Sequence, residues 1–220
     1  MRVAVIPYET KEKIYRFKMF KGKKILDIGC GNGWVIEQYA RHGAFCYGID
    51  LTEKAINLSY KRLSTSGLQA NLLVGDAQEL PYPSEYFDLV SSMGVLHHVP
   101  NTVRALSEIH RVLKPEGHTL LMFYHKNSLR YRLLFPCRKI RRGVSMQLLI
   151  NEFDGPENPL GKVFSRREVK TIMPGFRDFI FRVDWLMPSH YLSGKFWPYS
   201  MTRFLASRWG YFLYVWARKA

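Results

Sequence analysis

The stretch ILDIGCGNG, residues 25–33, places glycine at three alternate positions directly after a short apolar run. Gly29, Gly31 and Gly33 precede a segment, 34–43, whose pattern is helical. Because glycine has no Cβ atom, the backbone at such positions approaches another group closely. A strand, a glycine-rich loop and a helix in this order favour an α/β fold with a ligand at the end of the strand.

Length and composition are those of one α/β domain. The chain has 220 residues, of which 47% are hydrophobic, and this is sufficient for one large core. We expect a single domain over 1–220, with a cofactor-binding half over 1–125, a substrate cap over 125–164 and the rest of the sheet over 165–220. No run of about 18 apolar residues occurs, and the first residues carry charge early, without a small-residue cleavage site. We therefore expect a cytoplasmic protein without a spanning helix or a secretory signal.

The three cysteines, Cys30, Cys46 and Cys137, lie far apart in the sequence. Their spacing matches neither a metal site nor a disulfide framework, and it suits a reducing compartment. We interpret them as structural or incidental and expect no metal.

The formal net charge is +15, which creates an electrostatic potential that attracts anions. Nucleic acid, an anionic membrane surface and a phosphorylated or carboxylated substrate all fit such a charge. Between Lys126 and Arg142 there are seven Lys or Arg residues and no acid. A solvated basic helix face is the alternative interpretation, and Pro136 argues against one unbroken amphipathic helix.

Short apolar segments alternate with helical segments over the first 125 residues. The predicted strands cover 23–29, 44–50, 70–76, 86–92 and 118–124, and the predicted helices cover 34–43, 53–67 and 102–114. The last of these helices places Val103, Leu106, Ile109 and Leu113 on one face. Strands separated in this way form a parallel sheet with helices on both faces. Ligands of such sheets bind outside the carboxyl ends of the strands, where the sequence places Asp27, Asp50, Asp76 and Ser92.

The regular alternation ends after residue 125. The segment 125–164 is too long for an ordinary connection, and we expect it to form a functional cap of helices and loops. A short helix over 165–173, with Ser165 as its N-cap, precedes a strand over 176–185. The apolar run 210–219 predicts a final buried strand.

An acid at the end of the second strand narrows the class of ligand. Asp50 lies 21 residues after Gly29, where a carboxylate binds the hydroxyls of a ribose. NAD and an adenosyl cofactor both contain that ribose. However, the loop lacks the third glycine of a Gly-x-Gly-x-x-Gly loop, which seats a pyrophosphate, and Asp27 would repel phosphate but attract an amino group and a sulfonium. These two details favour the adenosyl cofactor.

Five segments resemble the successive motifs of class I S-adenosylmethionine-dependent methyltransferases: ILDIGCGNG, GIDLT, GDAQELPYPSEYFDLV, GVLHHVPN and LSEIHRVLKPEGHTLL. Within that class they are similar to the branch of small-molecule and quinone-biosynthesis methyltransferases. The resemblance covers about residues 20–125. It implies a Rossmann-like, mostly parallel, seven-stranded sheet in which the last strand, 211–217, is antiparallel and lies between the fifth and sixth strands.

The resemblance also implies contacts with S-adenosylmethionine and its product S-adenosylhomocysteine. Asp27 and the loop residues Gly29, Cys30, Gly31 and Gly33 would hold the methionine end, and Asp50 would bind the ribose hydroxyls. Leu51 would cover one face of the adenine, Asp76 would accept from its N6 amine, and the N–H of Ala77 would reach a ring nitrogen. Ser92 would offer its carbonyl near the amino group, with Met93 next to it. Taken singly, each of these residues is explained equally by an ordinary turn glycine or an exposed acid.

Methyl transfer requires an acceptor held in line with the bond that breaks and, for a hydroxyl or a protonated amine, a base. His97 matches the position of the catalytic base in the similar phosphoethanolamine methyltransferases, where an N-terminal tyrosine lies beside it. Tyr8 or Tyr15 would take the place of that tyrosine. The alternative is a structural His97 that is hydrogen-bonded to backbone at the strand end.

Three further residues are candidates for contact with the acceptor. His125 follows the fifth predicted strand, and Asp154 and Asn158 belong to the cap. A turn stabilised by its own side chains explains Asp154 and Asn158 nearly as well.

These observations are compatible with several functions. The first is methyl transfer to a natural product, an aromatic or a lipid-like acceptor, with 125–164 as a lid and the aromatic-rich 185–204 as an apolar wall. Methylation of RNA would use the positive charge, but no RNA-binding module is visible and no NPPY-type element follows the fourth strand. A peripheral membrane protein would place 126–142 on anionic lipid, which is compatible with a lipid acceptor. A cofactor-binding protein without catalysis is the remaining alternative.

Overall fold

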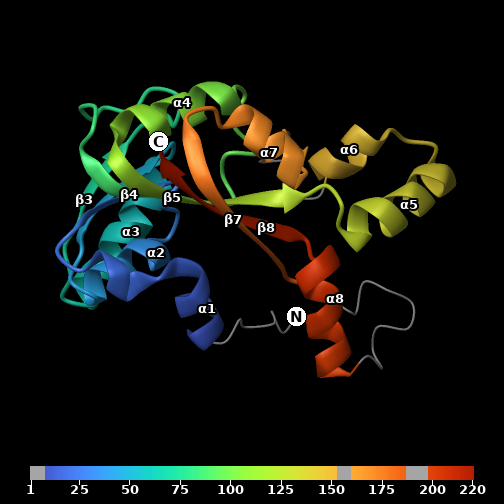
Figure 1. The fold of residues 1–220 in the computed structure, drawn as a ribbon, viewed down its shortest axis with the longest axis horizontal. Coiled ribbons are helices and arrows are strands. Elements are labelled where there is room, and N and C mark those ends of the chain that lie inside the picture. Colours follow the sequence, from blue (N-terminus) through green and yellow to red (C-terminus); the bar gives the residue numbers. More distant parts are fainter. Residues whose placement is uncertain (1–7, 153–159, 187–197) are drawn as a thin grey trace.

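A computed structural model describes residues 8–152, 160–186 and 198–220 of the chain (Figure 1). Its centre is an eight-stranded sheet in the order β3-β2-β1-β4-β5-β8-β7, with β6 paired to β5 outside that path. The strands are β1 Lys24–Ile28, β2 Phe45–Asp50, β3 Asn71–Val74, β4 Phe87–Met93, β5 Leu113–His125, β6 Val163–Phe164, β7 Phe176–Asp184 and β8 Phe212–Lys219.

The directions of the strands confirm the predicted mostly parallel sheet. β1 to β5 are paired in parallel, and β8 lies antiparallel between β5 and β7. The last strand is therefore inserted between the fifth and sixth predicted strands, as expected. The number of strands differs from the seven predicted, because the two-residue β6 joins the carboxyl end of β5. So short a strand has no apolar alternation by which a sequence pattern would reveal it.

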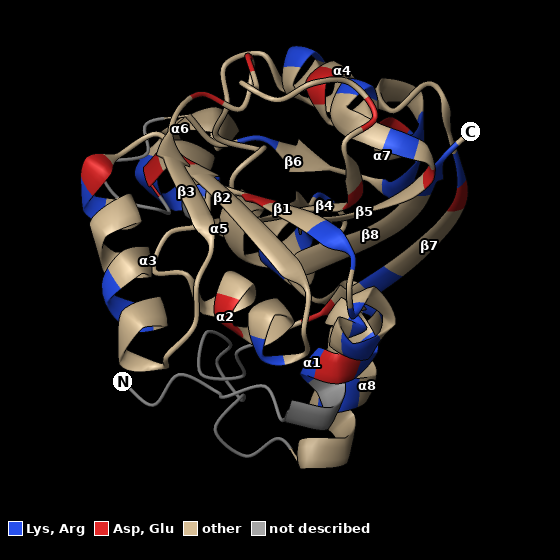
Figure 2. Ribbon diagram, turned by 90° about the vertical axis from the view of Figure 1, so that its left-hand side faces the viewer, with Lys and Arg blue, Asp and Glu red and all other residues tan. Residues whose placement is uncertain are grey.

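Helices cover both faces of the sheet (Figure 2). α2 Trp34–Arg41 and α3 Glu53–Thr65 lie on one side, together with α1 Tyr8–Tyr15 and the 3-10 helix η1 Phe17–Phe20. α4 Thr102–Val112 and α7 Arg166–Ile172 lie on the other side. The remaining helices are the π-helix η2 Arg130–Leu134, α5 Phe135–Arg142, α6 Met146–Asn151 and α8 Tyr199–Trp209. Within the described ranges, no helix has the length and apolar character needed to span a membrane.

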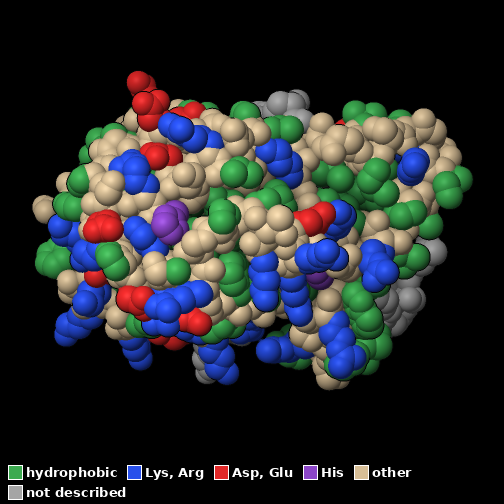
Figure 3. All heavy atoms as spheres, turned by 45° about the horizontal axis from the view of Figure 1, so that its top comes forward, with side chains coloured by type: hydrophobic (Ala, Val, Ile, Leu, Met, Phe, Trp, Pro, Cys, Tyr) green, Lys and Arg blue, Asp and Glu red, His purple; other side chains and the backbone are tan. Residues whose placement is uncertain are grey.

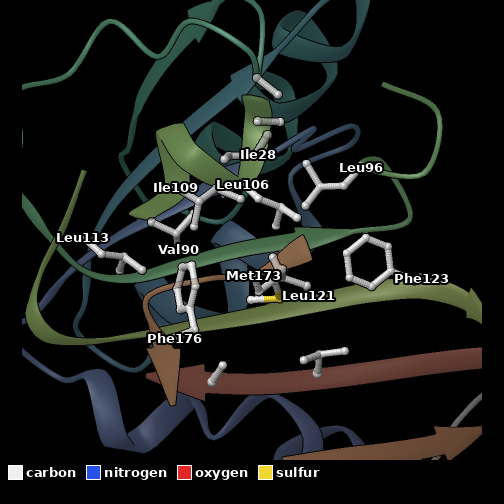
Figure 4. Close-up of a cluster of buried hydrophobic side chains, with 14 of the residues drawn as sticks. Ile28, Val90, Leu96, Leu106, Ile109, Leu113, Leu121, Phe123, Met173 and Phe176 are labelled. Carbon is white, nitrogen blue, oxygen red and sulfur yellow. The ribbon is translucent and has the colours of Figure 1, made fainter. Parts of the chain in front are cut away.

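Two layers of buried apolar side chains hold the helices on the sheet. Leu106 and Ile109 of α4 and Met173 after α7 pack on Val90 and Leu121 of the sheet (Figure 4). On the opposite face, Phe17, Tyr39 and other residues of η1, α2 and α3 form a second cluster. Burying one such side chain stabilises a fold by about 1.5–3 kcal/mol, so the two layers fix the strand ends rigidly in place.

The buried face of α4 is rotated by part of a turn from the predicted one. Val103 is 55% exposed, whereas Ala105, Leu106, Ile109 and Val112 are fully buried or nearly so. The buried stripe of α4 is centred on Ile109, which places Val103 at its margin, and Leu113 belongs to β5 instead of the helix.

The segment after β5 forms helices beyond the end of the sheet, as the predicted cap requires (Figure 1). The chain is helical from Arg130 through Arg142, because the π-helix η2 leads directly into α5. Pro136 does not interrupt this segment, since it stands in the first turn of α5, where proline is tolerated. Tyr131 and Phe135 are buried on the inner side of the segment and anchor it against Tyr211.

Candidate active site at the carboxyl ends of the strands

The predicted cofactor residues lie along one edge of the sheet. In the parallel register Ile28 is opposite Ile49, Asp50 is opposite Val74, and Met93 is opposite Met122. The loops that follow β1, β2, β3 and β4 therefore leave the sheet side by side. This confirms the predicted gathering of polar residues at the carboxyl ends of the strands.

The glycine loop is folded onto the end of β2. The N–H groups of Gly29 and Cys30 donate to the Ile49 carbonyl at 2.7 and 3.1 Å. The N–H of Gly31 donates to Oδ2 of Asp50 at 3.0 Å. The acid predicted to bind ribose thus already holds the loop predicted to bind the methionine end.

The three glycines have different neighbours. A Cβ atom on Gly29 would lie 2.2 Å from Cγ2 of Val95, and one on Gly33 would lie 2.9 Å from Ser59. A Cβ atom on Gly31 would meet only the Gly29 carbonyl oxygen, at 4.0 Å. At Gly29 and Gly33 the backbone therefore packs closely against other residues of the protein. Gly31 alone faces open space, with φ of +55°.

Asp27 is a buried acid on β1, only 2% exposed. Its Oδ1 accepts a hydrogen bond of 2.6 Å from Oγ of Ser91 on β4. The pKa of Asp27 is raised to about 7, chiefly because the carboxyl is buried; the Ser91 hydrogen bond lowers this pKa and the negative charge of Asp50 raises it. The sequence does not single out Ser91, although its position next to the predicted Ser92 is a signal.

The loops after β2 and β3 carry the other predicted cofactor residues. Oδ1 of Asp50 accepts from both N and Oγ1 of Thr52, at 3.0 and 3.1 Å. Leu51 is 72% exposed beside it, an apolar side chain left without cover at the edge of the site. Asp76 accepts from the backbone and side-chain amides of Gln78, at 2.8 and 2.9 Å, and Ala77 is buried.

Ser92 and Met93 end β4 as predicted. Oγ of Ser92 donates to the Ile28 carbonyl at 3.0 Å, so its hydroxyl joins β4 to β1. Met93 is partly buried and packs against the cluster on the α2 side of the sheet.

His97 stands in a buried aromatic cluster beyond β4. Its ring centroid lies 3.8 Å from that of Tyr124 and 4.2 Å from that of His98. The side chain is fully buried, and neither ring nitrogen is hydrogen-bonded within the part of the chain that the structure describes. Burial lowers the pKa of His97 well below its usual value, and the charge of His98 contributes, whereas the Met122 backbone acts in the opposite direction. His97 is therefore a neutral imidazole at pH 7.

A lysine that sequence reasoning missed fastens the end of the cap to this region. Nζ of Lys162 donates to the carbonyls of Val99 and Pro100, both at 2.8 Å, and to Oγ1 of Thr102 at 3.0 Å. Its backbone N–H donates to the His97 carbonyl at 3.0 Å. Nδ1 of His98 likewise donates to the Leu160 carbonyl, at 2.6 Å.

The remaining candidates have mixed positions. His125 is buried at the end of β5, and its Nδ1 donates to the Gly210 carbonyl at 3.1 Å. Tyr15 is buried beside Phe17 and Trp34, and no described contact joins it to His97. Tyr8 begins α1, but its side chain lies outside the description. Asp154 and Asn158 also lie outside the described residues.

Two further observations concern other kinds of site. In the described ranges, no group of three or more His, Cys, Asp and Glu side chains is arranged to hold a metal ion. A groove of about 850 Å³ lies between α3 and the starts of β1, β2 and β3, lined by Phe45, Tyr60 and Leu68 among others. It is at the opposite ends of the strands from the glycine loop and contains none of the predicted site residues.

Comparison with known proteins connects this arrangement to a family. Residues 26–121 match the family described as "Methyltransferase domain". Over 112 residues the chain is 38% identical to the ubiquinone biosynthesis O-methyltransferase of Azoarcus sp. (strain BH72), a match over 50% of this chain and 48% of that protein. It is 35% identical over 117 residues to the demethylmenaquinone methyltransferase of Geobacillus stearothermophilus, covering 51% and 50% of the two chains.

The chain thus spans about half the length of the curated relatives that it matches. The solved structure of a SAM-dependent methyltransferase from Methanosarcina mazei covers 99% of both chains with a TM-score of 0.66 and 22% sequence identity. At this identity the similarity shows a common fold.

Proposed function

We propose that the chain is a class I S-adenosylmethionine-dependent methyltransferase, which the match of residues 26–121 to a methyltransferase domain supports, and that it transfers a methyl group from S-adenosylmethionine to a small-molecule acceptor. One observation carries the proposal. Asp50 holds the N–H of Gly31 at 3.0 Å, while the space where Gly31 would carry a side chain is open. Such a loop presents backbone and carboxylate to a ligand at the place where this fold binds one.

The residues of the site fit the cofactor. The buried carboxyl of Asp27 and the loop around Gly31 suit a cationic amino-acid end, because a carboxylate attracts an ammonium and a sulfonium. Asp50 lies at the end of β2, where a ribose diol would receive its hydrogen bonds, and the exposed Leu51 offers an apolar surface to an adenine ring. Asp76, Ala77, Ser92 and Met93 complete the proposed contacts. S-adenosylmethionine supplies an electrophilic methyl group, so the protein has to position the acceptor and exclude water.

His97 is the proposed general base. A neutral imidazole without a hydrogen-bonding partner in the described structure is able to accept a proton from an acceptor hydroxyl. Its low pKa makes it a weak base, which is compatible with a phenolic proton and less so with an aliphatic alcohol. The ring of Tyr124 packs against the His97 ring at an interplanar angle of 42° and restricts its orientation.

The acceptor class that we favour is a phenolic or quinol ring. The two curated relatives are named for ubiquinone biosynthesis and demethylmenaquinone, and the matched residues include the loop that contains His97. The closely packed, mutually tilted rings of His97, Tyr124 and Tyr211 form an aromatic environment at the end of β5 that suits a planar acceptor. The cap residues His125, Asp154 and Asn158 are proposed contacts of that acceptor.

Calorimetry with S-adenosylhomocysteine tests the cofactor assignment. We expect binding to the unaltered chain and a loss of at least about tenfold in Asp50→Ala, because a charge-assisted hydrogen bond contributes about 1.5–3 kcal/mol. The matched control is Glu53→Ala, which removes an exposed acid of α3 near the site. Equal affinity in Asp50→Ala and the control would overturn the assignment.

Turnover tests the acceptor class and the base together. Release of S-adenosylhomocysteine would be followed with a catechol and a demethylated naphthoquinol as acceptors and with a short single-stranded RNA as the comparison. We expect methylation of a phenolic acceptor and its loss in His97→Asn, with cofactor affinity retained. Turnover by His97→Asn equal to that of the unaltered chain would exclude His97 as the base, and methylation of the RNA alone would overturn the small-molecule proposal.

A further inference from the structure

The helical segment 130–142 has an apolar outer side. Leu133 is 51% exposed and Ile140 is 84% exposed, and Cys137 between them is exposed as well. Their spacing of four and then three residues places them on one side of a helix. Because Tyr131 and Phe135 occupy the buried side, the outer stripe is not explained by packing within the described protein.

Basic side chains flank this stripe. Arg132, Lys139 and Arg141 are exposed, and no ion pair with a carboxylate is found for them among the described residues. Arg132 and Lys139 lie to one side of the apolar stripe and Arg141 lies to the other, at the turn of about 100° per residue of a helix. At the right-hand end of Figure 3, where Figure 1 places α5 and α6, hydrophobic and basic side chains stand next to each other on the surface.

This combination identifies the chemistry of the partner. An apolar stripe alone would fit a second protein, and cations alone would fit nucleic acid. A stripe of exposed Leu and Ile, flanked by Lys and Arg for which the described residues show no ion pair, matches a bilayer interface, where aliphatic side chains enter the acyl boundary and cations meet anionic headgroups. The net charge of +15 also attracts the whole protein toward an anionic surface.

The outer stripe belongs to a rigidly anchored element. Tyr131 on the inner side of the same segment contacts Tyr211 through a hydroxyl pair at 3.0 Å, and Tyr211 lies 4.5 Å from Tyr124 between ring centroids. Tyr124 in turn packs against the ring of His97. The surface stripe and the candidate acceptor site are therefore the two sides of one packed cluster.

We propose that the segment 130–142 binds the surface of an anionic lipid bilayer, with Leu133 and Ile140 inserted among the lipids and Arg132, Lys139 and Arg141 on the headgroups. The segment lies in the plane of the interface, and its inner side remains packed on Tyr211. This contact goes beyond methyl transfer and does not depend on it.

Co-sedimentation of the full chain with lipid vesicles tests the proposal. The chain should bind vesicles of phosphatidylglycerol mixed with phosphatidylcholine, and binding to pure phosphatidylcholine should be at least about tenfold weaker, because each cation near an anionic surface contributes about 1 kcal/mol. The double variant Leu133→Glu/Ile140→Glu should lose at least about tenfold in binding to the anionic vesicles. Lys139→Glu/Arg141→Glu should lose a similar amount.

Matched controls come from α3. Leu58 and Tyr60 are 47% and 51% exposed, so Leu58→Glu/Tyr60→Glu introduces the same charges at exposed apolar positions on another helix. Lys54→Glu/Lys61→Glu makes the same change in net charge as the variant of α5. Both controls should bind the anionic vesicles to within about twofold of the unaltered chain after allowance for the smaller net charge. Circular dichroism and cofactor binding of every variant show whether it is folded.

Three outcomes would overturn the proposal. The first is that the α3 controls weaken binding to anionic vesicles as much as the variants of the segment 130–142 do, because net charge alone would then explain the binding. The second is binding to single-stranded RNA that requires Lys139 and Arg141 but not Leu133 and Ile140. The third is a dimer in sedimentation experiments that Leu133→Glu/Ile140→Glu dissociates, with no binding to vesicles, because a second copy of the chain would then cover the stripe.

Discussion

We expect the buried carboxyl of Asp27 to couple cofactor binding to pH. In the proposed site the ionised form of Asp27 attracts a cationic ligand more strongly than the protonated form does, and the pKa of this carboxyl is raised to about 7, mainly by burial. We therefore expect the affinity for S-adenosylmethionine to be constant above about pH 8 and to fall by up to tenfold per pH unit below about pH 7. Calorimetry across this range would measure the slope. The Asp27→Asn variant should bind weakly with little dependence on pH, and a slope equal to that of the unaltered chain would assign the proton to another group.

The raised pKa of Asp27 also makes the stability of the fold depend on pH. Stability decreases with rising pH, whereas an acid in a salt bridge makes it increase. The folded chain holds a proton on Asp27 that the unfolded chain, with a pKa near 3.8, releases. This contribution to stability is fully present below about pH 4 and is lost as the pH rises through about 7, at a total cost on the order of 4 kcal/mol. Urea denaturation of Asp27→Asn should therefore show a stability that falls less with rising pH than that of the unaltered chain.

We expect Gly29 to have a structural role and Gly31 a ligand-binding role within one loop. Alanine at Gly29 would meet Val95 at φ of +70°, so Gly29→Ala should lose about 2–5 kcal/mol of unfolding free energy through backbone strain and overcrowding. Gly31→Ala should lose only about 1–2 kcal/mol, from the backbone alone, but should weaken cofactor binding. Urea denaturation and calorimetry on both variants would show the contrast. Adding Val95→Ala should restore part of the stability of Gly29→Ala, and an equal loss in both single variants would refute this division of roles.

At the scale of elements, Lys162 joins the end of the cap to the loop before α4. Lys162→Met keeps the apolar stem but leaves two carbonyls and the Thr102 hydroxyl without their donor, which should cost about 1–3 kcal/mol in unfolding free energy. The rate of hydrogen exchange should also rise at the backbone N–H of Lys162, which donates a hydrogen bond to the carbonyl oxygen of His97. Lys54→Met on the exposed side of α3 is the control and should change neither quantity. Exchange as slow as in the unaltered chain would show that the cap is held elsewhere.

The strands and the outline of the site were predictable because both follow from local pattern. A mostly apolar run such as residues 25–28 predicts a strand that is buried on both faces of a parallel sheet. The residue after such a strand lies at the carboxyl edge of the sheet, independently of the rest of the sequence. Ser165 was predictable as an N-cap for the same reason, and its capping box with Glu168 is present in the structure.

Elements and contacts without a local signal were not predictable. α8 buries Ala206 but exposes Tyr199 and Phe204, so its sequence shows no regular apolar stripe. The apolar wall expected over 185–204 falls largely outside the described residues and stays a prediction. The bonds of Lys162 join residues 60 to 63 positions apart, and nothing near Lys162 marks it as a donor to them. The ring contact between Tyr124 and His97 likewise depends on the placement of two strands and a loop.

At the scale of the whole molecule, a bound cofactor should raise the unfolding temperature. S-adenosylhomocysteine at about 100 times its Kd stabilises a folded protein by about 2.7 kcal/mol, which corresponds to a shift of about 5–10 °C for a chain of this length. A thermal melt with and without the ligand would measure it. NAD at the same concentration is the control, since it shares the adenosine ribose, and we expect no shift with it. A shift with NAD alone would reverse the choice between the two cofactors.

The position of β8 determines when the sheet can be completed. β7 is made before β8 but is separated from β5 by it, and β8 is the only described strand with which β7 pairs. During synthesis, β7 therefore has no place in the sheet until residues 212–219 have left the ribosome, whereas β1 to β5 can already pair in order. The candidate cofactor loops are assembled by the early strands, so a nascent chain acquires its glycine loop before it acquires a finished sheet.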